Sequence, residues 1–186
     1  GGADGNRDWV TLRNYRDDNE LDADINIRTH DIATLGLWGP KAANALGNFI
    51  DPNEIDISNF PFVSAKNLSL NLSGGKKVDV WAARISYVGE SGWEIYFNND
   101  KDDGLALYDS LLEAGVVPVG IETYANSRRL EKSFRLQGAD LETDYTAIEA
   151  AIQRPLVKEA DFHGKAAHLA QREEDPCAIL CTMTLD

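Results

Sequence analysis

A glycine-rich bend between two strand-like runs is the part of this sequence best suited to bind a small molecule. Residues 84–97 read Arg-Ile-Ser-Tyr-Val-Gly-Glu-Ser-Gly-Trp-Glu-Ile-Tyr-Phe. Gly89 and Gly92 let the backbone turn closely around a ligand, because glycine has no Cβ and tolerates unusual dihedral angles. Tyr87 and Glu94 flank the bend. A carboxylate accepts paired hydrogen bonds from the adjacent N–H donors of an aminopyrimidine, and a tyrosine ring packs against a flat heterocycle.

Taken alone, the bend favours a structural interpretation, a plain hairpin with a buried aromatic and an exposed acid. Other residue types offer less chemistry. The three histidines are scattered and none neighbours a serine or cysteine in a nucleophile-like setting. Cys177 and Cys181 have no further cysteine or suitably spaced histidine to complete a zinc site, so we expect buried thiols and no metal. Arg129 and Glu131 are expected on a helix, with the arginine pairing nearby acids and fixing the helix against the sheet.

The elements around the bend follow from hydrophobic spacing and from glycine and proline positions. A strand over 32–38 precedes a helix over 40–49, and a hairpin over 68–87 precedes a short strand over 94–97. Helical spacing follows over 105–112. This order predicts an α+β fold with a ferredoxin-like split βαβ core and helices on one face. Shorter elements are expected at 9–15 (helical), 121–134 (helical), 146–152, 164–172 and 178–185 (β-prone).

With 186 residues and 43% apolar content, the chain is long enough for one domain with an extension. We expect residues 1–24 to end a preceding segment and 25–135 to form the α+β core. Residues 136–177 are expected to form a helical and loop extension. Residues 178–186, a lone β-prone run, are expected to begin a truncated C-terminal β-domain or barrel.

The charge balance excludes several classes of partner. Thirty-one acidic side chains against 18 basic ones give a net charge of -13, which repels nucleic acid and anionic membrane surfaces. No run approaches the roughly 20 apolar residues that span a bilayer, and the N-terminus lacks a signal-peptide pattern. The sequence therefore predicts a cytoplasmic protein, or a mitochondrial-matrix one in a eukaryote. The acidic excess fits either a salt-adapted or an ordinary protein surface.

Several blocks together resemble one known family. Residues 84–94 resemble the Arg-x-x-Tyr-(Thr/Val)-Gly-Glu-x-Gly-(Trp/Phe)-Glu signature of the glycine-cleavage T-protein (aminomethyltransferase) family. Leu-Gly-Leu-Trp-Gly-Pro-Lys-Ala at 35–42 and Ser-Arg-Arg-Leu-Glu-Lys-Ser-Phe-Arg-Leu-Gln-Gly-Ala-Asp-Leu at 127–141 are similar to two more of its blocks in order and spacing. The segments 146–150 and 161–165 look like its Thr-Pro-x-Glu-Ala and Asp-Phe-Ile-Gly-Lys, so the resemblance covers roughly residues 10–186.

Three details make the chain most similar to the dimethylglycine and sarcosine dehydrogenase branch. These are Trp38 at the strand end, Lys132 after Leu-Glu, and Val88 within Tyr-Val-Gly-Glu. That branch normally carries an N-terminal flavin domain, which is absent from this sequence. The resemblance therefore implies FAD only in a missing domain or in a partner subunit.

The resemblance implies transfer of a one-carbon unit from a methylated or aminomethylated amine to tetrahydrofolate. It implies that Glu94 hydrogen-bonds the pterin ring and that Tyr87 lines the same pocket. Trp93 is interpreted mainly as a packing residue that also shapes the pocket wall. The expected partners are a small amine substrate and a flavin-dehydrogenase domain or subunit.

The sequence also departs from the family pattern. Ala125 replaces an arginine that helps to bind folate in glycine-cleavage enzymes, and the chain starts too late to include the strand with the catalytic aspartate. Asp4 and Asp8 lack that strand context, so no catalytic residue is assigned. A non-catalytic folate-binding module and an inactive fragment remain as alternatives. The iron–sulfur maintenance relatives are disfavoured, because their Lys-Gly-Cys-Tyr-type motif corresponds here to the cysteine-free segment 131–134.

Overall fold

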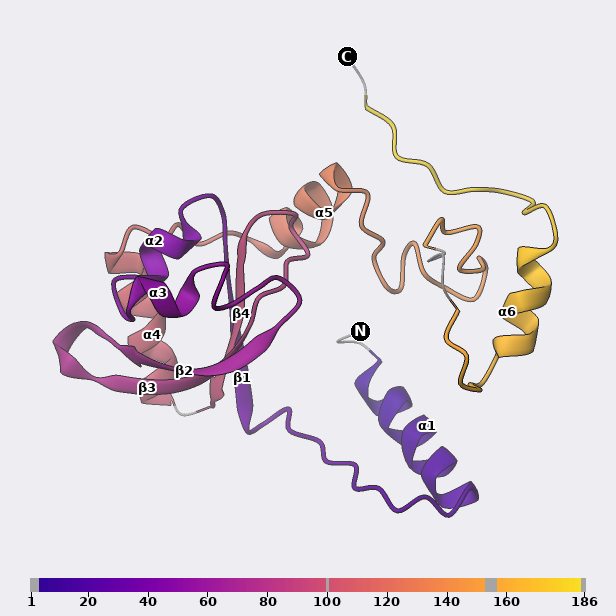
Figure 1. The fold of residues 1–186 in the computed structure, drawn as a ribbon, viewed down its shortest axis with the longest axis horizontal. Helices are drawn as coiled ribbons and strands as arrows, with labels where there is room; N and C mark the ends of the chain where they lie inside the picture. Colours follow the sequence, from indigo (N-terminus) through magenta and orange to yellow (C-terminus); the bar gives the residue numbers. More distant parts are fainter. Residues whose placement is uncertain (1–3, 100, 153–156, 185–186) are drawn as a thin grey trace.

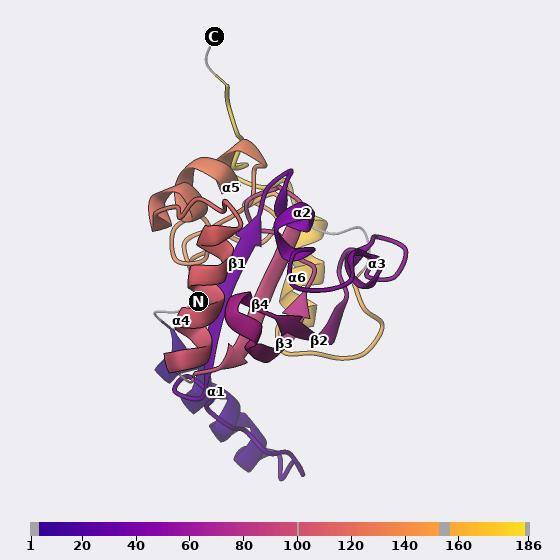
Figure 2. The ribbon, with the colours of Figure 1, turned by 90° about the vertical axis from the view of Figure 1, so that its left-hand side faces the viewer.

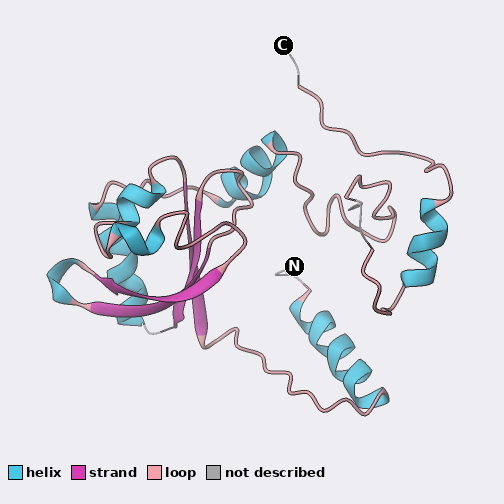
Figure 3. Cartoon of the chain, in the orientation of Figure 1, coloured by secondary structure: helices cyan, strands magenta, loops and turns pink. Residues whose placement is uncertain are grey.

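The computed structural model of the chain describes residues 4–99, 101–152 and 157–184 (Figure 1). All assigned strands lie between residues 32 and 98, and the segments on either side are helical or irregular (Figure 3). The elements in chain order are α1 (Gly5–Asp18), β1 (Ile32–Trp38), α2 (Ala42–Leu46), α3 (Pro52–Ile55), β2 (Ala65–Asn71), η1 (Ser73–Gly75), β3 (Lys77–Ala83), β4 (Gly92–Asn98), α4 (Lys101–Glu113), η2 (Thr123–Arg128), α5 (Arg129–Glu131) and α6 (Lys165–Arg172).

The strands form one four-stranded sheet in the order β1-β4-β3-β2, and every neighbouring pair is antiparallel. Two pairings matter for the site. Gly36 of β1 lies opposite Glu94 of β4, and Trp81 of β3 lies opposite Tyr96 of β4. Because side chains alternate along a strand, Glu94 and Tyr96 share one face, which we call the open face.

The other face of the sheet is buried beneath helices α2, α3 and α4, which Figures 1 and 2 show gathered on that side. Leu46 of α2, Ile55 of α3 and Leu107 of α4 belong to the same buried cluster as the inward residues of the strands. The strand residues in that cluster are Leu37, Leu68, Leu70, Val78, Val80, Ala82, Trp93, Ile95 and Phe97. The hydrophobic core thus makes the sheet a rigid floor for whatever stands on the open face.

The predicted α+β class is confirmed, but the ferredoxin-like split βαβ pairing is wrong. A split βαβ unit has two parallel strands around its helix, with one strand between them. Here β1 and β2, which flank helices α2 and α3, are antiparallel and have two strands between them. The reason is that β2, β3 and β4 follow one another as a meander, and the last of them pairs with β1. No strand follows α4 in the part of the chain that the structure describes.

Most of the predicted helices are present, whereas one is shorter than predicted and the C-terminal strand is absent from 178–184. Helices at 9–15, 105–112 and 121–134 are confirmed as α1, α4, and η2 with α5, and η2 is a π-helix. The short element expected at 164–172 is the helix α6. The helix predicted at 40–49 shortens to α2, and residues 146–152 form turns only. The expected strand at 178–185 is absent from 178–184, and residue 185 lies outside the described residues. The predicted domain boundaries, including the β-domain over 178–186, stay predictions.

The expectation of buried thiols is wrong, because Cys177 and Cys181 are both exposed. Both lie beyond α6 in a segment without helix or strand, where few neighbouring residues pack over the two thiols. Within the described residues, no group of three or more histidine, cysteine, aspartate or glutamate side chains is arranged to bind a metal. Over the same residues, no helix is long and apolar enough to cross a membrane.

Candidate functional site

Glu94 stands half-buried in the middle of β4, on the open face of the sheet. The residue opposite it, Gly36, has no side chain, and the Trp38 indole occupies the space that one would fill. A Cβ on Gly36 would meet ring atoms of Trp38 at 2.2 Å. Glycine at this position therefore lets the indole of the same strand lie across β1 beside Glu94.

Four aromatic rings from separate segments form a continuous aromatic wall: Trp38, Tyr87, Tyr124 and Phe134. The centroids of Trp38 and Tyr124 are 5.3 Å apart with the planes at 24°, and Tyr124 meets Tyr87 at the same distance in a tilted contact. Tyr87 stacks on Phe134 at 6.0 Å. Such offset and tilted pairs are favourable arrangements of aromatic rings. The wall thus joins β1, the bend and the η2–α5 helical segment.

Hydrogen bonds to the backbone fix two of these rings. The Trp38 Nε1 donates to the carbonyl of Ile85 at 3.0 Å, and the Tyr87 hydroxyl donates to the carbonyl of Arg135 at 2.8 Å. Both bonds join the wall to segments remote in sequence. The predicted Tyr87 therefore lies beside the bend, with its hydroxyl already engaged.

Three tyrosine hydroxyls of the site, two of them beside Glu94, remain protonated at neutral pH. Burial raises the pKa of Tyr87, and burial followed by the charge of Glu94 raises the pKa of Tyr124. Burial and then the hydrogen bond to Glu94 raise the pKa of Tyr96 to about 12. The Tyr96 hydroxyl donates to Glu94 Oε2. No ion pair to Glu94 forms among the described residues, so the remaining acceptor positions of its carboxylate can serve a neutral N–H donor.

The glycine-rich bend is fastened to the helical segment behind it. Gly89 has a φ of +76°, and the methylene chain of Lys132 fills the space where a Cβ would stand. Arg128 forms ion pairs with Glu90 of the bend and with Glu131 of α5. The bend therefore has a defined position relative to the aromatic wall, rather than that of a free hairpin tip.

Arg84, the first residue of the signature, is structural. It is buried, and its Nη1 donates to the carbonyls of Ile55 at 3.1 Å and Phe60 at 2.7 Å. Its guanidinium lies 4.9 Å from the centroid of Trp93. Trp93 is fully buried against Phe60 on the helix-covered face, opposite to the face of Glu94. A ligand-binding role for Trp93 stays a prediction, and packing is what the structure shows.

Arg129 pairs with an acid, as predicted, but its contacts do not lead to the sheet. It is buried and forms an ion pair with Asp140, and its Nε donates to the carbonyl of Ala125 at 2.7 Å. These contacts join the helical segment to the chain that follows it, rather than to the sheet. The small Ala125 side chain, in place of the family's arginine, brings no cation to the site.

Two residues that could support Glu94 were not expected from the sequence. Tyr96 carried a signal, because strand alternation places residue 96 on the same face as residue 94. Tyr124 carried none, since only the tertiary fold brings η2 next to β1. Asp4 and Asp8 lie on or beside α1 near Arg7, and Figures 1 and 2 show α1 apart from the sheet, joined to β1 by an extended segment.

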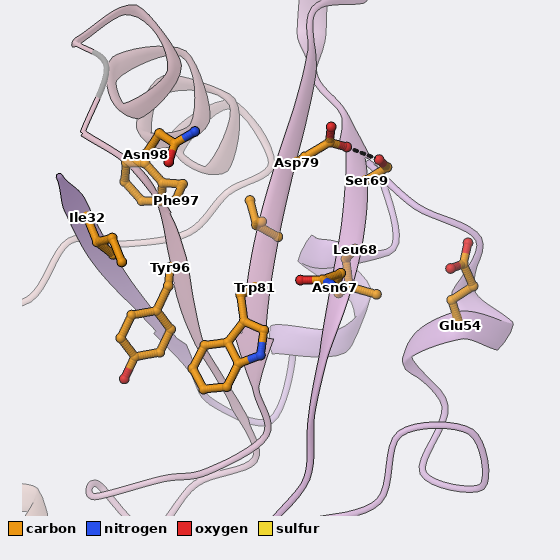
Figure 4. A pocket seen from close by; sticks show the side chains of 11 residues that line it. Ile32, Glu54, Asn67, Leu68, Ser69, Asp79, Trp81, Tyr96, Phe97 and Asn98 are labelled. Atoms are coloured by element: carbon orange, nitrogen blue, oxygen red, sulfur yellow. Dashed lines mark hydrogen bonds between the residues drawn. The ribbon is translucent and has the colours of Figure 1, made fainter. Parts of the chain in front are cut away.

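Beyond Tyr96 the open face is hollowed into a depression of about 900 Å³ (Figure 4). The rings of Trp81 and Tyr96 stand side by side at one end, with centroids 5.0 Å apart. At the other end the Ser69 hydroxyl donates to Asp79. An aromatic and acceptor-rich surface of this kind suits a flat, neutral ring that carries N–H donors.

These features define an α+β domain with a half-buried carboxylate set among aromatic rings. Residues 1–159 match the family model described as the GCVT N-terminal domain. The chain is 37% identical over 152 residues to human mitochondrial dimethylglycine dehydrogenase, covering 78% of this chain and 16% of that protein. It is 35% identical over 156 residues to an aminomethyltransferase of a Geobacillus strain, covering 81% of this chain and 40% of the relative. An aminomethyltransferase of Bacillus subtilis is 32% identical over 158 residues.

The chain therefore belongs to the GCVT family, through its N-terminal domain, and the resemblance drawn from the sequence motifs is confirmed. It spans about two fifths of the length of the aminomethyltransferases and less than a fifth of the dimethylglycine dehydrogenases that it matches.

Proposed function

We propose that this chain is the tetrahydrofolate-binding part of an enzyme that transfers a one-carbon unit from a methylated or aminomethylated amine to tetrahydrofolate. The observation that carries the proposal is Glu94, a half-buried carboxylate without an ion-pair partner in the described structure, placed beside the aromatic wall. The one-carbon chemistry is proposed from family membership, and the residues that bind the ligand are proposed from the geometry around Glu94.

The residues present fit the pterin ring of a folate. A carboxylate accepts two parallel hydrogen bonds from the adjacent N–H groups of a 2-amino-4-oxopyrimidine, and neighbouring rings pack against its flat surface. Glu94 lacks a cationic partner in the described chain that would compete with such donors. The Trp38 indole, which lies over Gly36, and the half-buried Tyr124 ring provide flat surfaces for such packing.

Each part of the site then has a definite task. Glu94 binds and orients the ring through its N–H groups, and the aromatic wall excludes water from those hydrogen bonds, which strengthens them. The Glu90–Arg128 ion pair keeps the bend in place. Bound tetrahydrofolate supplies the nitrogen nucleophile that accepts the one-carbon unit. No residue of this chain is proposed as the catalytic acid or base.

The amine donor and its oxidation belong to the wider enzyme in this proposal. Dimethylglycine dehydrogenases are among the relatives, so we propose a small methylated amine as substrate and a flavin-dehydrogenase domain or subunit as partner. FAD is proposed only in that domain or subunit. A cytoplasmic or mitochondrial-matrix location is proposed, since the human relative is named as mitochondrial.

Isothermal titration calorimetry with tetrahydrofolate under anaerobic conditions tests the site. Glu94→Gln keeps the shape but removes the charge, so we expect affinity to fall at least about tenfold, the value of roughly 1.5 kcal/mol for a charge-assisted hydrogen bond. Glu113→Gln, an exposed change on α4, is the matched control and should bind as the wild type does. Equal binding by all three proteins would remove Glu94 from the site.

A second candidate function is folate binding without chemistry. It is favoured by the surroundings of Glu94, where the hydroxyls of Tyr96 and Tyr124 keep their protons because their pKa values are raised, and neither is proposed as a catalytic acid or base. A formaldehyde-transfer assay separates the two candidates: tetrahydrofolate-dependent turnover by this chain alone contradicts the pure binding module. Binding without turnover supports it.

A further inference from the structure

We infer that Tyr96 is the positioning residue for Glu94, and that its hydroxyl gives the site its preference for a ring with a 2-amino group. This inference rests on the proposed folate function and concerns which groups of the ligand the carboxylate can accept. It assigns a specificity role to a residue outside the bend.

A hydrogen bond joins the side chains of Tyr96 and Glu94. Tyr96 follows Glu94 by two positions in β4, so both side chains stand on the open face, and the Tyr96 hydroxyl donates to Glu94 Oε2. Among the described residues no other side chain hydrogen-bonds to Glu94. A glutamate carboxylate otherwise turns easily about its last side-chain bond, which has broad energy minima. One fixed donor therefore sets the plane of the carboxylate.

The bond from Tyr96 leaves most lone pairs of the Glu94 carboxylate open. An ionised carboxylate has about four acceptor positions, and the Tyr96 hydroxyl takes one of them on Oε2. One position on Oε2 and those on Oε1 stay open, which is the arrangement that accepts two parallel N–H bonds. A 2-amino-4-oxopyrimidine offers such a pair, from its ring N–H and its amino group. A ring without the amino group offers only one donor.

The neighbouring strand β3 holds the Tyr96 ring in place. Trp81 lies directly opposite Tyr96 in the β3–β4 register, and the two rings pack at 5.0 Å with the planes at 56°. Figure 4 shows both rings projecting from the sheet next to each other. Cross-strand aromatic pairs of this kind stabilise a sheet and restrict ring motion. The hydroxyl is therefore aimed by the fold rather than by the ligand.

The Tyr96 hydroxyl stays protonated. With a pKa of about 12, Tyr96 keeps its proton throughout the pH range in which folates are handled. Among the described residues, Glu94 is the charged group that raises the pKa of Tyr96, and the Tyr124 hydroxyl is the other titratable neighbour that contributes. Tyr96 is thus a donor to the carboxylate at every relevant pH, and no pH switch arises from this pair.

The test measures affinity for two ligands, 5-formyltetrahydrofolate and its 2-desamino-2-methyl analogue, by calorimetry. The proteins are the wild type, Tyr96→Phe, Glu94→Gln, and Tyr108→Phe as a matched control on α4. The wild type should prefer the 2-amino ligand by about tenfold or more, as one charge-assisted hydrogen bond predicts. Tyr96→Phe should lose most of that preference by weakening the 2-amino ligand while leaving the analogue nearly unchanged. Glu94→Gln should also lose it, and Tyr108→Phe should retain it.

The outcomes separate the two levels of the proposal. If Tyr96→Phe keeps the wild-type preference, or weakens both ligands equally, the positioning role is overturned while folate binding stands. If the wild type binds neither ligand, the proposed function fails and takes the inference with it. Trp81→Leu, which removes the packing but not the hydroxyl, should give an intermediate loss of preference. Far-ultraviolet circular dichroism confirms that each variant is folded.

Discussion

Replacing Gly92 with alanine should be among the most damaging single-methyl changes in the chain. Gly92 opens β4 with a φ of +155°, a backbone conformation that residues with a Cβ rarely adopt. An added Cβ would lie 2.0 Å from the carbonyl oxygen of Leu37 and 2.8 Å from the Cα of Trp38. Both neighbours are backbone atoms of β1, so no side chain can rotate to make room.

The size of the effect follows from these two contributions. Backbone strain at such a φ costs about 1–3 kcal/mol, and forced displacement of packed neighbours costs about 1–3 kcal/mol more. We therefore expect Gly92→Ala to lower the free energy of unfolding by about 3–5 kcal/mol, a large part of the roughly 5–15 kcal/mol typical of a domain. The displaced Trp38 would also leave its stack on Tyr124, so folate affinity should fall in the protein that remains folded.

The matched control is Gly74→Ala in the β2–β3 turn. Gly74 also has a positive φ, of +75°, but an added Cβ meets nothing within 4 Å. This variant should lose only the strain, about 1–2 kcal/mol. Urea unfolding followed by tryptophan fluorescence gives both values. Equal destabilisation by the two variants would refute the contact argument and leave strain as the sole effect.

Three more predictions follow. Arg84→Met strands the carbonyls that Arg84 satisfies and should destabilise by about 2–4 kcal/mol in urea unfolding, whereas the exposed Arg28→Met should change stability by less than about 1 kcal/mol; similar values would count against a structural Arg84. Gly36→Val should push the Trp38 indole off β1 and weaken folate binding at least about fivefold in titration calorimetry. Gly74→Ala, in a turn where an added Cβ meets nothing, is the control and should leave folate affinity nearly unchanged. The raised pKa of Tyr96 stabilises the fold fully below pH 10 and progressively less between pH 10 and about 12, because only the unfolded chain then releases the proton easily. Tyr96→Phe should flatten that decline in a pH series of urea midpoints, and an unchanged slope would contradict it.

Much of the local structure could be predicted from the sequence, because it depends on short-range patterns. Alternating apolar residues identified the hairpin of β2 and β3, and helical spacing over 105–112 identified α4. The same alternation places Trp93 and Glu94 on opposite faces of β4. Their adjacency in the sequence suggested a shared pocket wall, and that role of Trp93 stays a prediction.

The order of the strands could not be predicted in the same way. Side-chain alternation reports which residues of a strand face the core, but it does not report which strand lies next to which. The pairing of β1 with β4 joins residues about 60 positions apart and depends on packing of the whole sheet. The split βαβ prediction failed at this point, and the exposed cysteines were missed because coverage by distant segments also leaves no local signal.

The sequence by itself determined the family, the α+β class, and the candidacy of Tyr87 and Glu94, because motif spacing and periodicity are properties of neighbouring residues. Only the tertiary structure decided the surroundings of Glu94: the indole lying over Gly36, the Tyr124 ring brought from η2, and the Tyr96 hydroxyl aimed by Trp81. These contacts depend on which strands and helices become neighbours in space. That choice is made by burial of the common core, and no single segment contains it.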